Sequence, residues 1–236
     1  MKTVTKLALA LEKGKETDVE CQSRRLWLKN AALASASGLF MAACGRGDLR
    51  ATTDNASTRP ANVFVEDAQL LNAALALEHE AIALYSAAAT LPFMQAAAVA
   101  PILSIAGTFL QHHISHRDSL IATINGMQVV NPQVADPVVS LPVSDYVAPV
   151  GAKLTDVVKV VQLASLKEME ACKAYLSLIK SFKDPTLART SGMLGGDEAA
   201  HYGALRAALF AVLGDTSVTA TTVIPSSMPT GFQQNF

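Results

Sequence analysis

Apolar residues recur at three- and four-residue intervals along four long stretches of the chain, and each stretch predicts an α-helix. The predicted helices cover about residues 66–90, 100–126, 156–182 and 184–214. The third helix is expected to start after Thr155 and Asp156, which are plausible N-caps, and the fourth to open at Asp184-Pro185. Between the second and third helices, residues 127–153 contain four prolines and no helical period. We therefore expect an all-α fold of two helical hairpins joined by a long connection.

Each apolar stripe is interrupted near its middle by carboxylate or imidazole side chains. All five histidines of the chain lie at these interruptions, and so do five of the six glutamates that follow residue 44. Random scatter of polar residues over helix surfaces does not produce this clustering. The residues expected to face the core together are Glu78, His113, His116, Glu168, Glu198 and His201.

One motif, E-x-E-A-x-x-x-Y, occurs twice, at residues 78–85 and 168–175. Its Glu and Tyr lie two helical turns apart on one face, roughly 10 Å along the axis. We therefore expect Tyr85 and Tyr175 to point inward with Glu78 and Glu168. The second glutamates of the motif, at positions 80 and 170, point ~200° away around the helix and are expected to face solvent. His79 faces sideways and is expected to be a surface or interface residue.

The predicted cluster needs positive charge, because an unpaired buried carboxylate costs several kcal/mol. No Lys or Arg lies on the four stripes, so a pair of divalent metal ions is the simplest source of that charge. The i, i+3 spacing of Glu198 and His201 lets both reach one ion from adjacent turns. Mixed oxygen and imidazole ligands suit iron, manganese or zinc. His112 flanks the stripe of the second helix and is a further candidate ligand.

Composition agrees with a helical domain and narrows its chemistry. The chain has 236 residues, half of them apolar and 6% aromatic. Its formal net charge of −1 gives no sign of nucleic-acid binding. After residue 44 the only cysteine is Cys172, so we expect no intramolecular disulfide in the body. The fold must then be held by its core or by metal.

The N-terminal region has the order of parts found in an export signal. Residues 23–29 resemble the bacterial twin-arginine motif, with Trp27 in place of Phe, and a charge-free apolar run follows, too short to span a membrane. Residues 41–44 resemble a lipoprotein box, with Met41 where Leu is usual, so Cys44 is a candidate for lipidation. Ordinary cleavage nearby is the alternative. Either route implies the periplasm or cell envelope, with Cys44 as the only membrane contact.

The expected domains follow from these features. Residues 1–43 form a twin-arginine signal peptide, and residues 44–63 form a flexible tether. Residues 64–213 form the helical bundle, and residues 214–236 form an irregular C-terminal tail rich in Thr, Ser and Pro.

The bundle resembles the ferritin-like di-iron carboxylate superfamily, which includes rubrerythrin-type and bacterial ferritin-like proteins. Its pattern is one Glu from each of two helices and Glu-x-x-His from each of the other two, with a long crossover between hairpins. Glu78 and Glu168 match the lone glutamates, and Glu198 with His201 matches one Glu-x-x-His. The resemblance implies that Tyr85 and Tyr175 hydrogen-bond beside the ligands.

The second helix departs from this pattern, because it carries His113-x-x-His116 in place of Glu-x-x-His. An imidazole there removes a negative charge and a bridging carboxylate. The site could hold two metals asymmetrically, one metal, or a metal other than iron.

The resemblance implies a metal-binding protein with oxidase, ferroxidase or peroxide-consuming activity. Two iron ions are the expected cofactor, with manganese or zinc as alternatives. The expected partners are metal ions and O₂ or peroxide, and a homodimer is left open. The competing interpretation is a non-enzymatic envelope lipoprotein with a degenerate or structural metal site.

Overall fold

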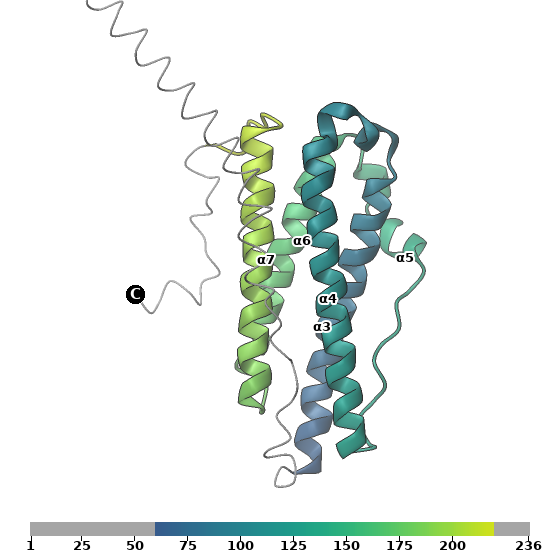
Figure 1. The fold of residues 1–236 in the computed structure, drawn as a ribbon, viewed down its shortest axis with the longest axis vertical. Helices are drawn as coiled ribbons and strands as arrows, with labels where there is room; N and C mark the ends of the chain where they lie inside the picture. Colours follow the sequence, from purple (N-terminus) through teal and green to yellow (C-terminus); the bar gives the residue numbers. More distant parts are fainter. Residues whose placement is uncertain (1–59, 220–236) are drawn as a thin grey trace, which may run out of the picture.

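A computed structural model of the chain describes residues 60–219, and these form an all-α bundle. The four long helices are α3 (Ala61–Ala89), α4 (Ala100–Val130), α6 (Val157–Leu178) and α7 (Pro185–Ala211). A short helix, α5 (Val143–Val147), and three 3-10 turns (Pro92–Gln95, Ala97–Val99 and Gly151–Lys153) lie in the connections. No strand occurs within residues 60–219. The predicted all-α four-helix bundle is confirmed (Figure 1).

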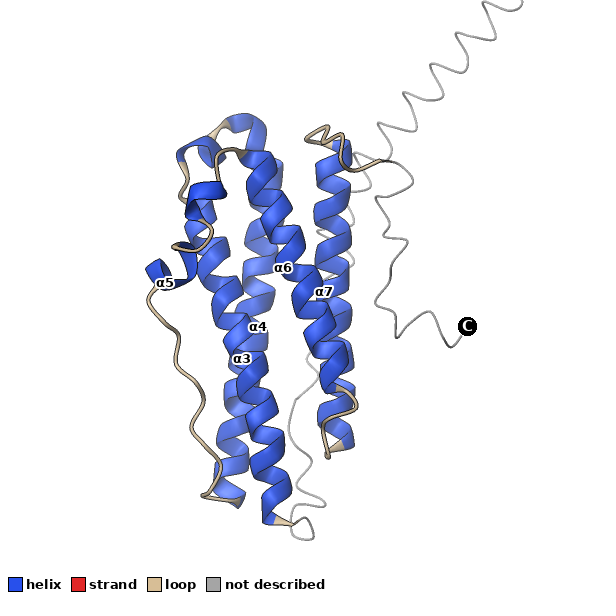
Figure 2. Ribbon diagram, turned by 180° about the vertical axis from the view of Figure 1, so that it is seen from behind, coloured by secondary structure: helices blue, strands red, loops and turns tan. Residues whose placement is uncertain are grey.

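The four long helices pack as two hairpins, α3 with α4 and α6 with α7. Figure 2 shows the long connection leaving the lower end of α4, passing α5 and reaching the opposite end of the bundle, where α6 begins. This is the crossover that the sequence predicted between the second and third helices. It makes α3 and α6, which carry the two copies of the repeated motif, corresponding helices of the two hairpins.

The helix limits differ from prediction by a few residues. α3 begins at Ala61, so three residues assigned to the tether are helical. α4 continues past Gly126 to Val130, since a glycine inside a helix lowers stability without ending it. α6 ends at Leu178, four residues before the predicted end, and α7 ends at Ala211. The predicted N-cap Asp156 accepts from the Lys159 amide at 2.9 Å. At the start of α7, Asp184 caps the helix by accepting from the Thr186 amide at 2.7 Å.

The connection between the hairpins is folded against α3. The Val138 amide donates to Oδ1 of Asn72 at 2.8 Å, and Nε2 of His79 lies 3.1 Å from the Val138 carbonyl. His79 is consequently only 8% exposed. The sequence predicted a surface or interface residue here, and the structure places His79 at the interface between α3 and this connection. Helical periodicity alone cannot show that a connection covers that face.

Two apolar clusters fill the ends of the bundle. One surrounds Phe109 and Leu209, and the other surrounds Leu75 and Ile124. A buried carboxylate joins the hairpins at the second cluster: Asp67 of α3 accepts from the backbone amides of Lys183 at 2.8 Å and residue 184 at 2.9 Å. The candidate site lies between the two clusters.

The start of the C-terminal tail lies on the bundle. Asp215 accepts from the Gln162 side chain at 2.8 Å, and Val218 is 4% exposed. The rest of the tail, the signal peptide, Cys44 and the tether up to residue 59 lie outside the described residues. Among residues 60–219, one stretch, Ala97–Val130, is long and apolar enough to cross a membrane by length and composition alone. In the bundle this stretch carries three buried histidines.

Candidate metal centre

Side chains from all four long helices meet in the middle of the bundle. Each is at most 5% exposed, and their neighbours along the helices belong to the two apolar clusters. The structure brings together all six residues expected there: Glu78 of α3, His113 and His116 of α4, Glu168 of α6, and Glu198 and His201 of α7.

The ligand atoms fall into two overlapping sets, each with atoms within 4.8 Å of one another. One set is formed by Glu78, His113, His116 and Glu198. The other is formed by His113, Glu168, Glu198 and His201. Each set combines two carboxylates with two imidazoles, and His113 and Glu198 belong to both. The cluster therefore has the layout of two adjacent cation positions with two shared side chains.

His113 spans the centre of the cluster. Its Nδ1 lies 2.9 Å from Oε2 of Glu78, and its Nε2 lies 3.2 Å from Oε1 of Glu168. The imidazole thus connects the lone glutamates of the two hairpins. It occupies the place on α4 where the superfamily pattern has a carboxylate.

The Glu-x-x-His residues of α7, Glu198 and His201, lie on the Glu168 side of the cluster. Nδ1 of His201 lies 2.9 Å from Oε2 of Glu198 and 3.3 Å from Oε2 of Glu168. The i, i+3 spacing places Glu198 and His201 on adjacent turns of one face, as the sequence predicted.

Each tyrosine of the repeated motif bonds to the glutamate of the opposite hairpin. The Tyr85 hydroxyl donates to Oε1 of Glu168, and the Tyr175 hydroxyl donates to Oε1 of Glu78. Both tyrosines are buried. Burial and the adjacent carboxylates raise the pKa of both phenols well above the usual value, so both remain protonated donors. The reciprocal bonds fix the orientation of the two lone glutamates.

His112 lies outside both sets of ligand atoms. Its Nδ1 is 2.9 Å from Nε2 of His201, and the two rings stack with centroids 5.1 Å apart. Burial and the nearby histidines lower the pKa of His112 to about 4, so its ring is neutral beside His201. Partners of this kind orient a metal-binding histidine.

Sequence reasoning missed one neighbour of the cluster, Asp197. Its Oδ2 lies 3.4 Å from Nε2 of His116, on the side facing away from Glu78. Adjacency to Glu198 in the sequence was the available signal. A carboxylate behind an imidazole increases the basicity of that ring.

Two buried polar atoms of the cluster have no hydrogen-bond partner. Nδ1 of His116 and Oε1 of Glu198 are buried, have no hydrogen-bond partner, and lie 3.3 Å apart. Buried polar atoms are normally satisfied, so two such atoms facing each other need an explanation. A cation between them would satisfy both, and the residues present therefore fit a metal site.

The pKa values show how protons balance the cluster when no cation is bound. Burial raises the pKa of Glu78, but His113 and His116 outweigh it and lower that pKa to about 2. Burial lowers the pKa of His116, but Asp197, Glu198 and Glu78 outweigh it and raise that pKa to about 12. A protonated His116 thus offsets an ionised Glu78, and a cation would replace the proton.

The second glutamates of the motif lie outside the cluster. Lys167 of α6 joins them across the two hairpins, with Nζ 3.1 Å from Oε1 of Glu80 and 3.1 Å from Oε2 of Glu170. Both remain at least partly exposed. Cys172 is buried, and burial raises the pKa of its thiol, as befits a small core residue.

A four-helix bundle with a long crossover, and with carboxylates and imidazoles paired across its core, defines the ferritin-like class of helical proteins. The chain belongs to the ferritin-like domain family, whose model matches residues 66–211. The match covers all four helices that carry the cluster. No curated protein and no solved structure matches the chain.

Proposed function

We propose that this ferritin-like protein holds two divalent metal ions, iron foremost, and uses them in oxidase, ferroxidase or peroxide-consuming chemistry. The observation that carries the proposal is the pair of buried, overlapping ligand sets, one of which contains two polar atoms without a hydrogen-bond partner. Manganese suits the same ligands, and zinc suits them without redox chemistry.

The chain's own residues have separable tasks in this proposal. Glu78 and His116 would hold one ion, Glu168 and His201 the other, and the shared residues would contact both. Iron or manganese held there would supply two oxidation states for reaction with O₂ or peroxide. The tyrosines orient the lone glutamates, and the apolar clusters exclude bulk water from the ligands.

Metal analysis of the purified protein tests the proposal. We expect stoichiometric metal in the wild type and a loss of at least about tenfold in affinity when Glu78→Gln and Glu168→Gln are combined. The matched control combines Glu80→Gln and Glu170→Gln, which changes the same residue type two positions further along the same helices. Equal metal content in the two double variants would reject the assigned site.

Redox activity is tested separately from metal binding. The proposal predicts that the optical spectrum of the iron-loaded protein changes on adding O₂ or peroxide. The alternative, a structural or degenerate site in a non-enzymatic envelope lipoprotein, predicts zinc or no metal and no spectral change. It is favoured by one observation: His113 contacts two glutamates through its two nitrogens and so can satisfy them without metal.

We also propose that the protein is exported by the twin-arginine pathway and anchored through a lipid on Cys44. Support comes from the sequence of residues 23–44 alone. The mass of the mature N-terminus tests both points. Combined Arg24→Lys and Arg25→Lys should retain the chain in the cytoplasm, and a mature chain beginning elsewhere than Cys44 would reject lipidation.

A further inference from the structure

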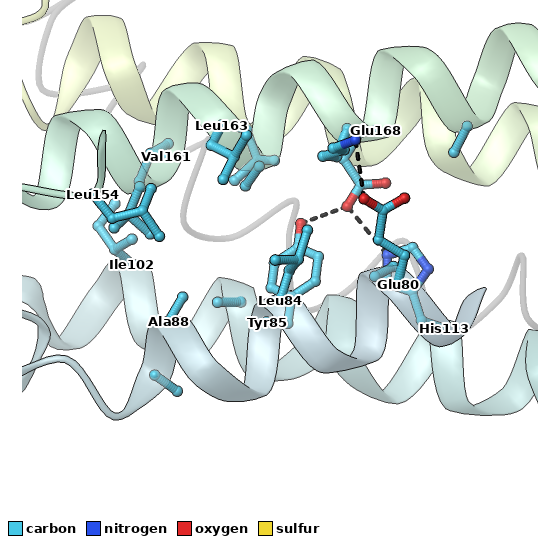
Figure 3. A pocket seen from close by; sticks show the side chains of 18 of the residues that line it. Glu80, Leu84, Tyr85, Ala88, Ile102, His113, Leu154, Val161, Leu163 and Glu168 are labelled. Atoms are coloured by element: carbon cyan, nitrogen blue, oxygen red, sulfur yellow. Dashed lines mark hydrogen bonds and ion pairs between the residues drawn. The ribbon is translucent and has the colours of Figure 1, made fainter. Parts of the chain in front are cut away.

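A cavity lies between α3 and α6 and reaches the candidate metal centre from one side. It has a volume of about 80 Å³. Figure 3 shows Leu154 and Ile102 at one end and Glu168 with His113 at the other. The ring of Tyr85 stands between the two ends, with its hydroxyl directed at Glu168. An occupant would therefore lie against the outer side of the bond between Tyr85 and Glu168.

The size of the cavity limits what can enter it. A water molecule needs roughly 10–15 Å³ measured in this way, so the cavity has room for about five to eight groups of that size. This fits a single ring or a short aliphatic chain. It is too small to enclose a peptide or a long acyl chain.

The polarity of the cavity limits the charge of the occupant. Apart from the groups at the metal-centre end and the charged residues Glu80, Lys167 and Glu170, the lining is aliphatic, with alanines at several positions. Lys167 is the only lysine or arginine lining the cavity, and it is paired with both of those glutamates at 3.1 Å. A carboxylate ligand would therefore meet more negative than positive charge. A neutral ligand avoids this cost.

The repeated motif indicates what opens the space on this side of the bundle. The repeated motif places Tyr175 at the position equivalent to Tyr85, three residues before Leu178. Leu178 packs into the apolar cluster that surrounds Tyr175. The equivalent residue in the first hairpin is Ala88, which lines the cavity. The smaller side chain leaves space where the second hairpin has a leucine.

We infer that this cavity is a binding site for a neutral apolar molecule of single-ring size, held beside Tyr85 and Glu168. Release of water from an aliphatic lining favours such a ligand. Binding itself does not depend on metal. The closeness of the ligand to a metal ion rests on the proposed function.

Fluorine NMR with fluorobenzene, a neutral single-ring probe, tests the inference on the full chain. We expect saturable binding by the wild type. Ala88→Leu, which installs the residue of the second hairpin, should weaken binding by at least about tenfold. Ala87→Leu is the matched control, because it makes the same change one position away and outside the lining; it should bind as the wild type does. The anion 4-fluorobenzoate should bind at least about tenfold more weakly than fluorobenzene.

Absence of saturable binding, equal binding by Ala88→Leu and the wild type, or equal binding of the anion would overturn the inference. If circular dichroism shows that Ala88→Leu does not fold, Ala164→Leu on the opposite wall takes its place. Fluorobenzene binding by a protein that fails the metal analysis would keep the cavity assignment and reject the proposed function. In iron-loaded protein the bound fluorine signal should broaden, and an unchanged line width would reject the placement beside the centre.

Discussion

The hydroxyl of Tyr85 on α3 donates to Oε1 of Glu168 on α6, a residue 83 positions further along the chain. The same bond recurs in the opposite direction, from Tyr175 to Glu78. Each hairpin thus orients the lone glutamate of the other. The position of each lone glutamate therefore depends on a tyrosine of the other hairpin. Substituting these tyrosines tests the candidate centre directly.

Removing either tyrosine hydroxyl should weaken metal binding. Tyr85→Phe removes the hydroxyl that donates to Oε1 of Glu168, and we expect metal affinity to fall by about 10- to 100-fold. Tyr175→Phe should have a similar effect through Glu78. Competition with a chromogenic chelator measures both. Tyr202→Phe is the control, because the Tyr202 ring lies near Arg206 and not in the cluster; a loss as large in this variant would count against specific orientation.

His112 should affect metal binding through His201. His112→Leu removes the partner of Nε2 on His201, and we expect metal affinity to fall by about tenfold or more. His79→Leu removes another buried histidine, one that contacts the Val138 carbonyl outside the cluster. This control should lower the melting temperature without changing the affinity of the remaining folded protein. Equal affinities in the two variants would show that His112 does not position His201.

The sequence was sufficient to predict the helices and the membership of the cluster, because both depend on periodicity. A glutamate or histidine in the middle of an apolar stripe faces the core, because the stripe itself packs there. The pairing of tyrosines with glutamates was not predictable in the same way. Seven residues separate Glu78 from Tyr85, roughly 10 Å along one helix, so the hydroxyl must find its acceptor on a neighbouring helix.

Contacts that depend on tertiary packing were missed. The bond between His112 and His201 requires the relative rotation of α4 and α7, and the contact between His116 and Asp197 requires the same information. His79 is buried because the connection lies over α3. The sequence of that connection has no helical period from which its position could be predicted. The cavity beside Ala88 depends on how far apart α3 and α6 lie.

Stability of the metal-free protein should depend on pH in both directions. The pKa of Glu78 falls from 4.5 to about 2 on folding, so its contribution to the free energy of unfolding is complete above pH 4.5 and is lost as pH falls toward 2. The pKa of His116 rises from 6.5 to about 12, so its contribution is complete below pH 6.5 and is lost as pH rises above that value.

Urea unfolding in the presence of a chelator, repeated across pH, should therefore give a maximum between pH 4.5 and 6.5. Metal-loaded protein is the comparison. Metal displaces the histidine protons, so the stabilisation that it adds should grow with pH. A metal-free stability that stays constant above pH 6.5 would contradict the proton balance described for the cluster.

Two adjacent glycines of α7 should respond oppositely to alanine. A Cβ on Gly195 would lie 3.3 Å from Cβ of Tyr175, whereas one on Gly196 would meet nothing within 4 Å. We expect Gly196→Ala to raise the free energy of unfolding by about 1 kcal/mol. Crowding against Tyr175 should make Gly195→Ala destabilising by about 1 kcal/mol. Thermal unfolding of both variants measures the difference, and equal melting temperatures would argue against close contact between α6 and α7 here.

The most direct test of the central claim is an anaerobic calorimetric titration of the metal-free protein with Fe²⁺. The two overlapping ligand sets predict saturation at two ions per chain, and the Glu78→Gln, Glu168→Gln double variant should lose saturable binding. The Glu80→Gln, Glu170→Gln control should saturate as the wild type does. Saturation at one ion would reduce the centre to a single site, and the absence of saturable binding would contradict the account.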